Sequence, residues 1–227
     1  MANSLTDIYV GVKKDDPNRK KNDFYPTPPL ATYILCKYAR PPQNVVEPCA
    51  GRGNISIELE RNGHNVKSFD LNEYDNNLVD IETGVDVLEL ERPSDYDGLV
   101  TNPPYHKDLP RKIAEKALEE YPYVAMFVRL TFLEGKKRKN LFTKYPPSDI
   151  ILLSDRINFG SGLVEPINKT HQLGGMIAYM WIVWDKRLMN LERSTKLHWV
   201  LLENEYDEWR AQYDQRSNSS GGRGYST

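Results

Sequence analysis

The sequence predicts an α/β fold in which helices cover both faces of a mostly parallel sheet. Short apolar segments of strand length alternate with longer segments of helical period over most of the chain. Several apolar segments end in an acidic or amide side chain followed closely by glycine or proline. The 227 residues, 39% hydrophobic and 27% charged, are sufficient for one globular domain with a substantial core.

Proline, glycine and capping residues mark the ends of the predicted helices. The first helix, 30–38, follows Thr27 and two prolines. The second, 55–61, stops at Gly63, and the third opens at Asp108 and extends to about residue 120. Seven strands are expected, at 45–46, 66–69, 85–87, 99–101, 124–130, 150–153 and 176–184, before a final helix within 197–213.

Polar segments flank this region at both ends. We interpret residues 1–22 as a flexible arm, 23–215 as a single domain and 216–227 as a disordered tail of low complexity. No apolar run is long enough to span a bilayer, and the polar N-terminus does not resemble a signal peptide. Cys36 and Cys49 lack metal-type spacing, and we expect no metal site and a reduced, cytoplasmic setting.

The residues Asn102-Pro103-Pro104-Tyr105 follow the predicted strand 99–101. Consecutive prolines neither extend a helix nor donate to a sheet, so the chain turns here with a rigid backbone. This turn would place the Asn102 carboxamide, the Pro103 carbonyl and the Tyr105 ring at the carboxyl edge of the sheet, where α/β proteins bind ligands. Two acceptors beside a ring suit a planar group that carries NH2. A proline-rich surface loop is the alternative interpretation.

A glycine-containing loop follows the first predicted strand. Gly51 and Gly53 allow a tight turn and a close approach of the backbone to a ligand, and the next helix opens with free N–H groups. Asp70 ends the next strand about 20 residues on, where an acid holds ribose hydroxyls. A phosphate loop is disfavoured, because no Lys-Ser/Thr pair follows and Glu47 would repel phosphate. S-adenosylmethionine, a nucleoside with a cationic group in place of phosphates, suits both acids.

With these motifs in this order, residues 23–185 resemble the class I S-adenosylmethionine-dependent methyltransferases. More narrowly, they resemble small phage-encoded and orphan enzymes that methylate the exocyclic amino group of adenine in DNA. Residues 23–28 are similar to the N-terminal cofactor motif, 47–53 to the glycine loop and 102–105 to the catalytic motif, in an order typical of the gamma arrangement. The resemblance implies a Rossmann-like sheet of seven strands with the last one, 178–184, antiparallel.

The resemblance also implies a role for each matching residue. Thr27 would contact the methionine carboxylate of the cofactor, cap the first helix, or both. Asp70 would hold the ribose or cap the next turn, and Asp86 would meet the adenine amino group, although Asp80 and Glu89 are near in sequence. The implied catalytic residues are Asn102, Pro103, Pro104 and Tyr105, and the implied cofactor-binding residues are Phe24, Tyr25, Thr27, Glu47, Pro48, Ala50, Gly51, Gly53, Asp70, Leu71, Asp86, Val87 and Asn102.

In the mechanism that this motif implies, Asn102 and the Pro103 carbonyl accept the two hydrogens of the adenine amino group, and Tyr105 stacks on a base flipped out of the duplex. The basic run Lys136, Lys137, Arg138 and Lys139 and the N-terminal arm are candidate DNA contacts, although such a run is also typical of a solvated loop. Phe159 either packs against the flipped base or closes the core.

Three features leave alternatives open. The net charge of −2 is not that of a protein coated for nucleic acid, and only two modest insertions, 134–148 and 160–175, are available for target recognition. Specificity is therefore short, relaxed or supplied by a partner. The same four-residue motif also occurs in enzymes that methylate RNA bases or the glutamine of release factors. A non-catalytic methyltransferase scaffold is a further alternative, and the oligomeric state is open.

Overall fold

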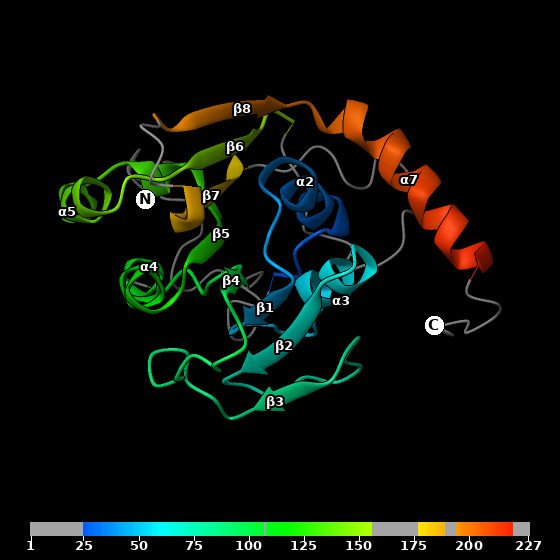
Figure 1. Ribbon diagram of the computed structural model, residues 1–227, viewed down its shortest axis with the longest axis horizontal. Helices are drawn as coiled ribbons and strands as arrows, with labels where there is room; N and C mark the ends of the chain where they lie inside the picture. Colours follow the sequence, from blue (N-terminus) through cyan, green and yellow to red (C-terminus); the bar gives the residue numbers. More distant parts are fainter. Residues whose placement is uncertain (1–24, 107, 156–176, 189–193, 220–227) are drawn as a thin grey trace, which may run out of the picture.

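Eight strands form one sheet with helices on both faces (Figure 1). The computed structural model describes residues 25–106, 108–155, 177–188 and 194–219. The strands are β1 (Asn44–Glu47), β2 (Asn65–Asp70), β3 (Ile81–Thr83), β4 (Gly98–Thr101), β5 (Tyr123–Arg129), β6 (Asp149–Leu153), β7 (Tyr179–Asp185) and β8 (Lys196–Val200). The helices are α2 (Pro29–Ala39), α3 (Asn54–Arg61), α4 (Leu109–Glu120), α5 (Lys136–Lys144) and α7 (Leu202–Ser219), with short 3₁₀ turns η2 (Leu130–Leu133) and η3 (Lys186–Leu188).

The strand order is β3-β2-β1-β4-β5-β7-β6-β8. Strand β7 is antiparallel to both of its neighbours, and every other pair is parallel. From β1 the chain builds the sheet outward through β2 and β3, and it then returns to the other side of β1 to add β4 and β5. The carboxyl ends of β1 and β4 therefore flank a topological switch point, which is where open α/β sheets bind ligands.

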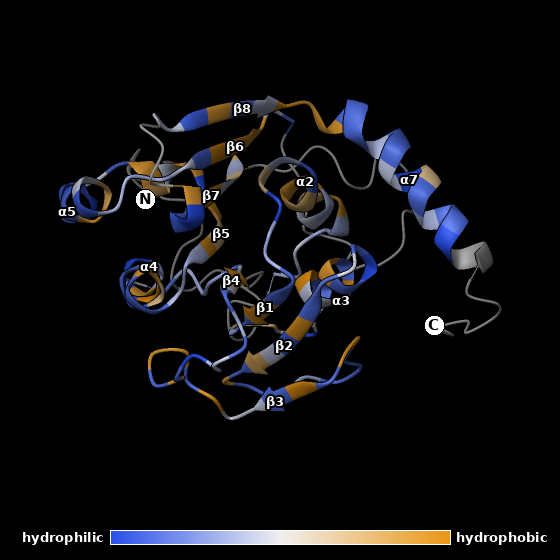
Figure 2. Ribbon diagram, in the orientation of Figure 1, coloured by the Kyte–Doolittle hydropathy of each residue, from blue (hydrophilic) through white to orange (hydrophobic). Residues whose placement is uncertain are grey.

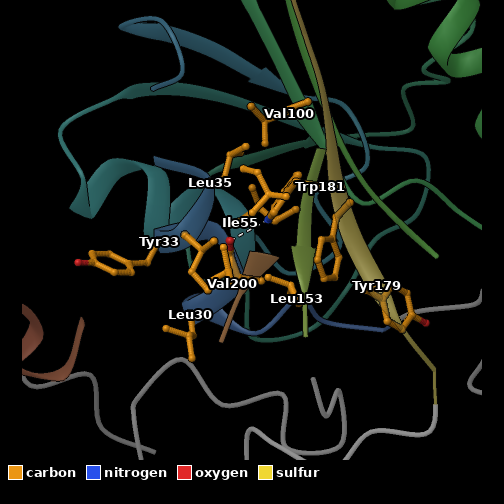
Figure 3. Close-up of a cluster of buried hydrophobic side chains, with 14 of the residues drawn as sticks. Leu30, Tyr33, Leu35, Ile55, Val100, Leu153, Tyr179, Trp181 and Val200 are labelled. Carbon is orange, nitrogen blue, oxygen red and sulfur yellow. Dashed lines mark hydrogen bonds between the residues drawn. The ribbon is translucent and has the colours of Figure 1, made fainter. Parts of the chain in front are cut away.

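Two hydrophobic cores lie on the two faces of the sheet. Helices α2, α3 and α7 cover one face, and α4 and α5 cover the other. On the first face Leu35, Ile55 and Val100 converge on Trp181 (Figure 3), whose indole Nε1 donates to the Ala31 carbonyl at 2.7 Å. Figure 2 shows that apolar residues concentrate on the inner strands and on the side of α4 that faces them.

The sequences of the elements explain these positions. Strands β5 and β7 are almost entirely buried, as expected for strands covered on both faces, and both are continuous apolar runs. Helix α4 buries Ile113, Ala117 and Leu118, the residues that the helical period places on one face. The predicted α/β class, the mostly parallel sheet, the antiparallel strand and the helices on both faces are thus confirmed.

Three expectations about the elements were wrong. The sheet has eight strands rather than seven, because residues 196–200 form the edge strand β8 instead of the start of a helix. Its five residues pair in parallel with β6, and most of them are exposed, whereas Val200 is buried. The third strand lies at 81–83, and residues 85–87 turn away from it after the Val85 N–H donates to the Asp70 carbonyl at 3.1 Å. Helix α7 ends at Ser219, whereas the predicted final helix ended at residue 213.

Several predicted features lie outside the described residues. These are the arm 1–22, Phe24, the segment 156–159 with Phe159, the insertion 160–175 and residues 220–227 of the tail. The other insertion, 134–148, contains α5.

Candidate active site

A cavity of about 260 Å³ lies at the carboxyl ends of the strands beside the switch point. Glu47 is the last residue of β1, Asp70 is the last residue of β2, and Asn102 follows β4. The structure gathers these predicted residues around it: Tyr25, Thr27, Glu47, Pro48, Ala50, Gly51, Asp70, Leu71, Asp86, Val87, Asn102, Pro103, Pro104 and Tyr105. Among the described lining residues, three are acidic and none is basic.

Glu47 holds the start of α3 while it lines the cavity. Its Oε2 accepts hydrogen bonds from the Ser56 backbone N–H at 2.8 Å and from the Ser56 hydroxyl, which also lies 2.6 Å from the Ser68 hydroxyl. The side chain is 1% exposed, and burial raises its pKa to about 8 despite these bonds. A cation in the cavity would favour the ionised carboxylate.

The other two acids shape the loops around the cavity. Asp70 accepts from the Gly51 N–H at 2.7 Å and from the Asn72 N–H at 2.8 Å, so it ties the glycine loop to the end of β2. Asp86 accepts from the Leu88 N–H at 2.9 Å with one oxygen. The Ser56 N–H, at the start of the helix where free N–H groups were expected, and the Gly51 N–H of the loop are therefore both satisfied by acids of the chain itself.

The Asn102 carboxamide is held at both ends. Its Nδ2 donates to the Thr27 hydroxyl at 2.9 Å and to the Tyr25 carbonyl at 3.3 Å, and its Oδ1 accepts from the Tyr105 hydroxyl at 2.6 Å. A carbonyl can only accept, so the contact with Tyr25 determines which end of the amide is nitrogen. Thr27 is not the helix cap: that position is Pro28, and it has no side-chain cap.

The Tyr105 ring stands between the cavity and the sheet. Its hydroxyl also lies 3.0 Å from the Phe127 carbonyl, and burial raises its pKa well above the usual range. The ring meets Tyr179 edge-on with centroids 6.1 Å apart. The hydroxyl therefore buttresses Asn102, a role that the sequence did not indicate. The stacking of the Tyr105 ring on a base stays a prediction.

Gly53 does not line the cavity, although the sequence placed it with the cofactor-binding residues. It has a φ of +86° at the start of α3, and a Cβ there would lie 2.5 Å from the Val79 side chain. Gly53 thus allows the conformation of the loop and its close packing on Val79, and it does not contact the cavity.

The cavity is also lined by residues that the sequence did not indicate: Pro26, Cys49, Asn54, Ile55, Asn72, Tyr74, Val85, Leu88 and Leu109. Asn54 is the most informative, because it is 4% exposed and its Nδ2 is buried without a hydrogen-bond partner among the described residues. A buried donor of this kind is rare unless a ligand or water satisfies it. Cys49 is half-buried, and desolvation raises the pKa of its thiol to about 12, so the thiol is not a ready nucleophile.

The basic run lies in the first turn of α5. Lys136, Lys137 and Lys139 are exposed, whereas Arg138 donates to the carbonyls of Thr131 and Glu134 at 2.6 and 2.7 Å. Lys137 and Arg138 help to lower the pKa of Asp108, mainly set by Arg111, at the start of α4. The run is therefore near the segment that follows the Asn102 motif.

No protein-family model and no curated protein matches this chain. A Listeria monocytogenes protein assigned to the class I S-adenosylmethionine-dependent methyltransferases matches its structure with a TM-score of 0.53 at 12% identity, over 94% of this chain and 74% of that one. A modification subunit assigned to a type I restriction enzyme of Vibrio vulnificus matches with a TM-score of 0.49 at 12% identity, over 88% and 54%. The fold is that of the class I methyltransferases, with an eighth strand added beside β6.

None of the helices in the described residues is long and apolar enough to cross a bilayer. No group of three or more His, Cys, Asp or Glu side chains in this part of the chain could hold a metal ion.

Proposed function

We propose that the protein is an S-adenosylmethionine-dependent methyltransferase that methylates the exocyclic amino group of adenine in DNA. The observation that carries this proposal is the Asn102 carboxamide, which Thr27, Tyr25 and Tyr105 hold at the wall of the cavity. A carboxamide fixed beside a proline carbonyl is suited to accept the hydrogens of a planar NH2 group.

The cavity suits this cofactor on two counts. Three of its described lining residues are acidic and none of them is basic, which disfavours phosphates and favours a nucleoside that carries positive charge. The buried Asn54 donor, which no described residue satisfies, would suit the cofactor carboxylate. In this proposal Glu47 attracts the cationic end, Asp70 takes the ribose and Asp86 the adenine amino group. Bound S-adenosylmethionine would supply a methyl group activated by its sulfonium charge.

The adenine amino nitrogen is a poor nucleophile, because its lone pair is delocalised into the ring. The Asn102 Oδ1 already accepts from Tyr105, but an amide oxygen has a second lone pair. That lone pair and the Pro103 carbonyl would each accept one amino hydrogen and hold both out of the ring plane. The nitrogen lone pair would then be exposed, and the fixed positions of the two acceptors would supply much of the rate enhancement.

Adenine in a duplex is paired, so the base would have to be flipped at a cost of about a few kcal/mol. Phosphate contacts from Lys136, Lys137 and Lys139, which are exposed beside the catalytic segment, would offset part of this cost. We keep Phe24 as a cofactor contact and Phe159 as a base contact within this proposal. In this proposal target specificity is short, relaxed or supplied by a partner subunit.

The test is transfer of labelled methyl from S-adenosylmethionine to duplex DNA, single-stranded DNA, RNA and protein extract, followed by nucleoside analysis. We expect N6-methyladenine from DNA. The Asn102→Ala variant should lose transfer by at least ~100-fold and keep most of its cofactor affinity, because Asn102 acts on the amino group. Asn65→Ala, an exposed residue at the opposite edge of the sheet, is the control.

Three results would contradict the proposal. Full activity of Asn102→Ala would exclude this mechanism. Label in RNA or protein would keep the chemistry and change the substrate, whereas cofactor binding without transfer to any of them would favour a scaffold.

A further inference from the structure

Arg129, at the carboxyl end of β5, is a cation that contacts the catalytic motif through the Tyr105 ring. Its guanidinium carbon lies 4.9 Å from the centroid of the Tyr105 ring, and its side chain hydrogen-bonds Tyr179. Its Nε is buried and has no hydrogen-bond partner among the described residues. Arginines 111 and 187 each form an ion pair with a carboxylate, whereas no carboxylate of the described chain pairs with Arg129.

The strand order places Arg129 on the far side of Asn102 from the cavity acids. The adjacent strands β2, β1, β4 and β5 end, in that order, at Asp70, Glu47, the Asn102 motif and Arg129. Thr101 pairs with Met126, so Arg129 stands three residues further along β5, beyond the carboxyl edge of β4. One side of the catalytic amide is therefore acidic and the other is basic.

A half-buried guanidinium with no acid partner among the described residues is unusual, since arginine stays charged at any ordinary pH and its burial is normally offset by an anion. The Tyr105 ring supports the guanidinium through a cation–π contact, but a ring is not an anion and does not neutralise its charge. The guanidinium fork matches the oxygens of a phosphate diester.

We propose that Arg129 binds the phosphodiester next to the extruded nucleotide of the DNA substrate. This inference rests on the proposed function and deepens it, because it explains how the site selects a polynucleotide over a glutamine side chain. From Arg129 the chain passes through η2 to the exposed lysines of α5, and Arg138 ties that turn together through the Thr131 and Glu134 carbonyls. In this proposal Arg129 binds one phosphate, and the lysines of α5 bind other phosphates of the DNA backbone.

The experiment compares Arg129→Gln with Arg92→Gln in the full chain. Arg92 pairs with Asp97 before β4, at the opposite edge of the sheet, so both variants lose one positive charge. The readouts are cofactor affinity and the KM for duplex DNA at several salt concentrations. Arg129→Gln should raise the KM about 10-fold and reduce the slope of log KM against log salt by about 0.9, the value for one lost phosphate contact. Cofactor affinity should not change.

The outcomes separate this inference from the proposed function. If the wild-type protein methylates no nucleic acid, both fail. If it methylates DNA and Arg129→Gln matches Arg92→Gln in KM and salt slope, only the role of Arg129 fails. If the protein methylates RNA and Arg129→Gln changes the salt slope by the same amount, Arg129 binds a phosphodiester of RNA instead of DNA.

A second variant guards against a folding defect in Arg129→Gln. Arg129→Lys keeps the charge and loses the fork, so it should keep the wild-type salt slope and raise the KM about threefold. A fall in kcat with no change in KM would instead indicate that Arg129 only supports Tyr105, and would overturn the proposal.

Discussion

At the scale of single residues, Glu47 is the side chain whose protonation is most clearly coupled to folding. It is 1% exposed, and burial raises its pKa in the folded protein to about 8, above its usual range in an unfolded chain. A group with a raised pKa binds its proton more tightly when the protein is folded. Glu47 therefore lowers the stability of the ligand-free protein as pH rises from about 4.5 to about 8.

Glu47→Gln should remove this penalty, because glutamine can still accept from Ser56 and carries no charge. We expect the variant to melt about 5–10 °C above the wild-type protein at pH 8.5 and within about 1 °C of it at pH 4.5. Thermal melts across this range, without cofactor, provide the measurement. Glu58, with a pKa raised by burial to about 7, is present in both proteins and cancels in the difference. A constant difference at all pH values would refute this coupling.

At the scale of elements, the turn between β1 and α3 depends on the close packing of the Gly53 backbone against the Val79 side chain. Gly53 combines a φ of +86° with a packing distance that leaves no room for a Cβ beside Val79. Gly63, at the other end of α3, has a φ of +91° and open space around it. A side chain at Gly63 would therefore meet backbone strain alone, whereas a side chain at Gly53 would meet both backbone strain and steric overlap.

Gly53→Ala should destabilise the protein by about 2–4 kcal/mol, and Gly63→Ala by about 1–2 kcal/mol, because only the first adds overlap to strain. Urea denaturation measures both. Adding Val79→Ala to Gly53→Ala should recover part of the difference, since it removes the colliding methyl group. Equal losses for the two glycine variants would show that packing on Val79 is unimportant.

At the scale of the whole molecule, α7 joins the end of the chain to the first core. Trp209 is 2% exposed, and its Nε1 donates to the buried Glu58 of α3 at 3.1 Å. Tyr33 and Lys37 of α2 bond Glu208 at 2.8 and 2.6 Å. This helix therefore joins α2 and α3 on the face of the sheet that they cover.

Trp209→Ala should reduce the free energy of unfolding by about 3–5 kcal/mol, because it opens a cavity and leaves Glu58 short of a donor. Trp199→Ala is the matched control: this residue is 70% exposed on β8, and its loss should cost less than about 1 kcal/mol. Chemical denaturation of both variants checks the prediction, and comparable losses would contradict it.

The class of fold and most of the cavity wall could be predicted from the amino-acid sequence alone. Local patterns carry this information, since apolar runs specify buried strands, and a polar residue that ends such a run lies at the ligand-binding edge. Glu47, Asp70 and the Asn102 motif were found in this way. The strand at 196–200 was missed because a short segment before a helix has no clear period, and its pairing with β6 decides its conformation.

The pairing of polar atoms, in contrast, depends on the three-dimensional fold. Residues 75 positions apart meet where Thr27 accepts from Asn102, and the Gly51 and Ser56 N–H groups bind acids instead of a ligand. Arg129 and Asn54 were overlooked because nothing local distinguishes an uncompensated arginine or amide from a solvated one. Pairing and burial depend on what the fold places opposite each side chain, and that information is not local to any segment of the sequence.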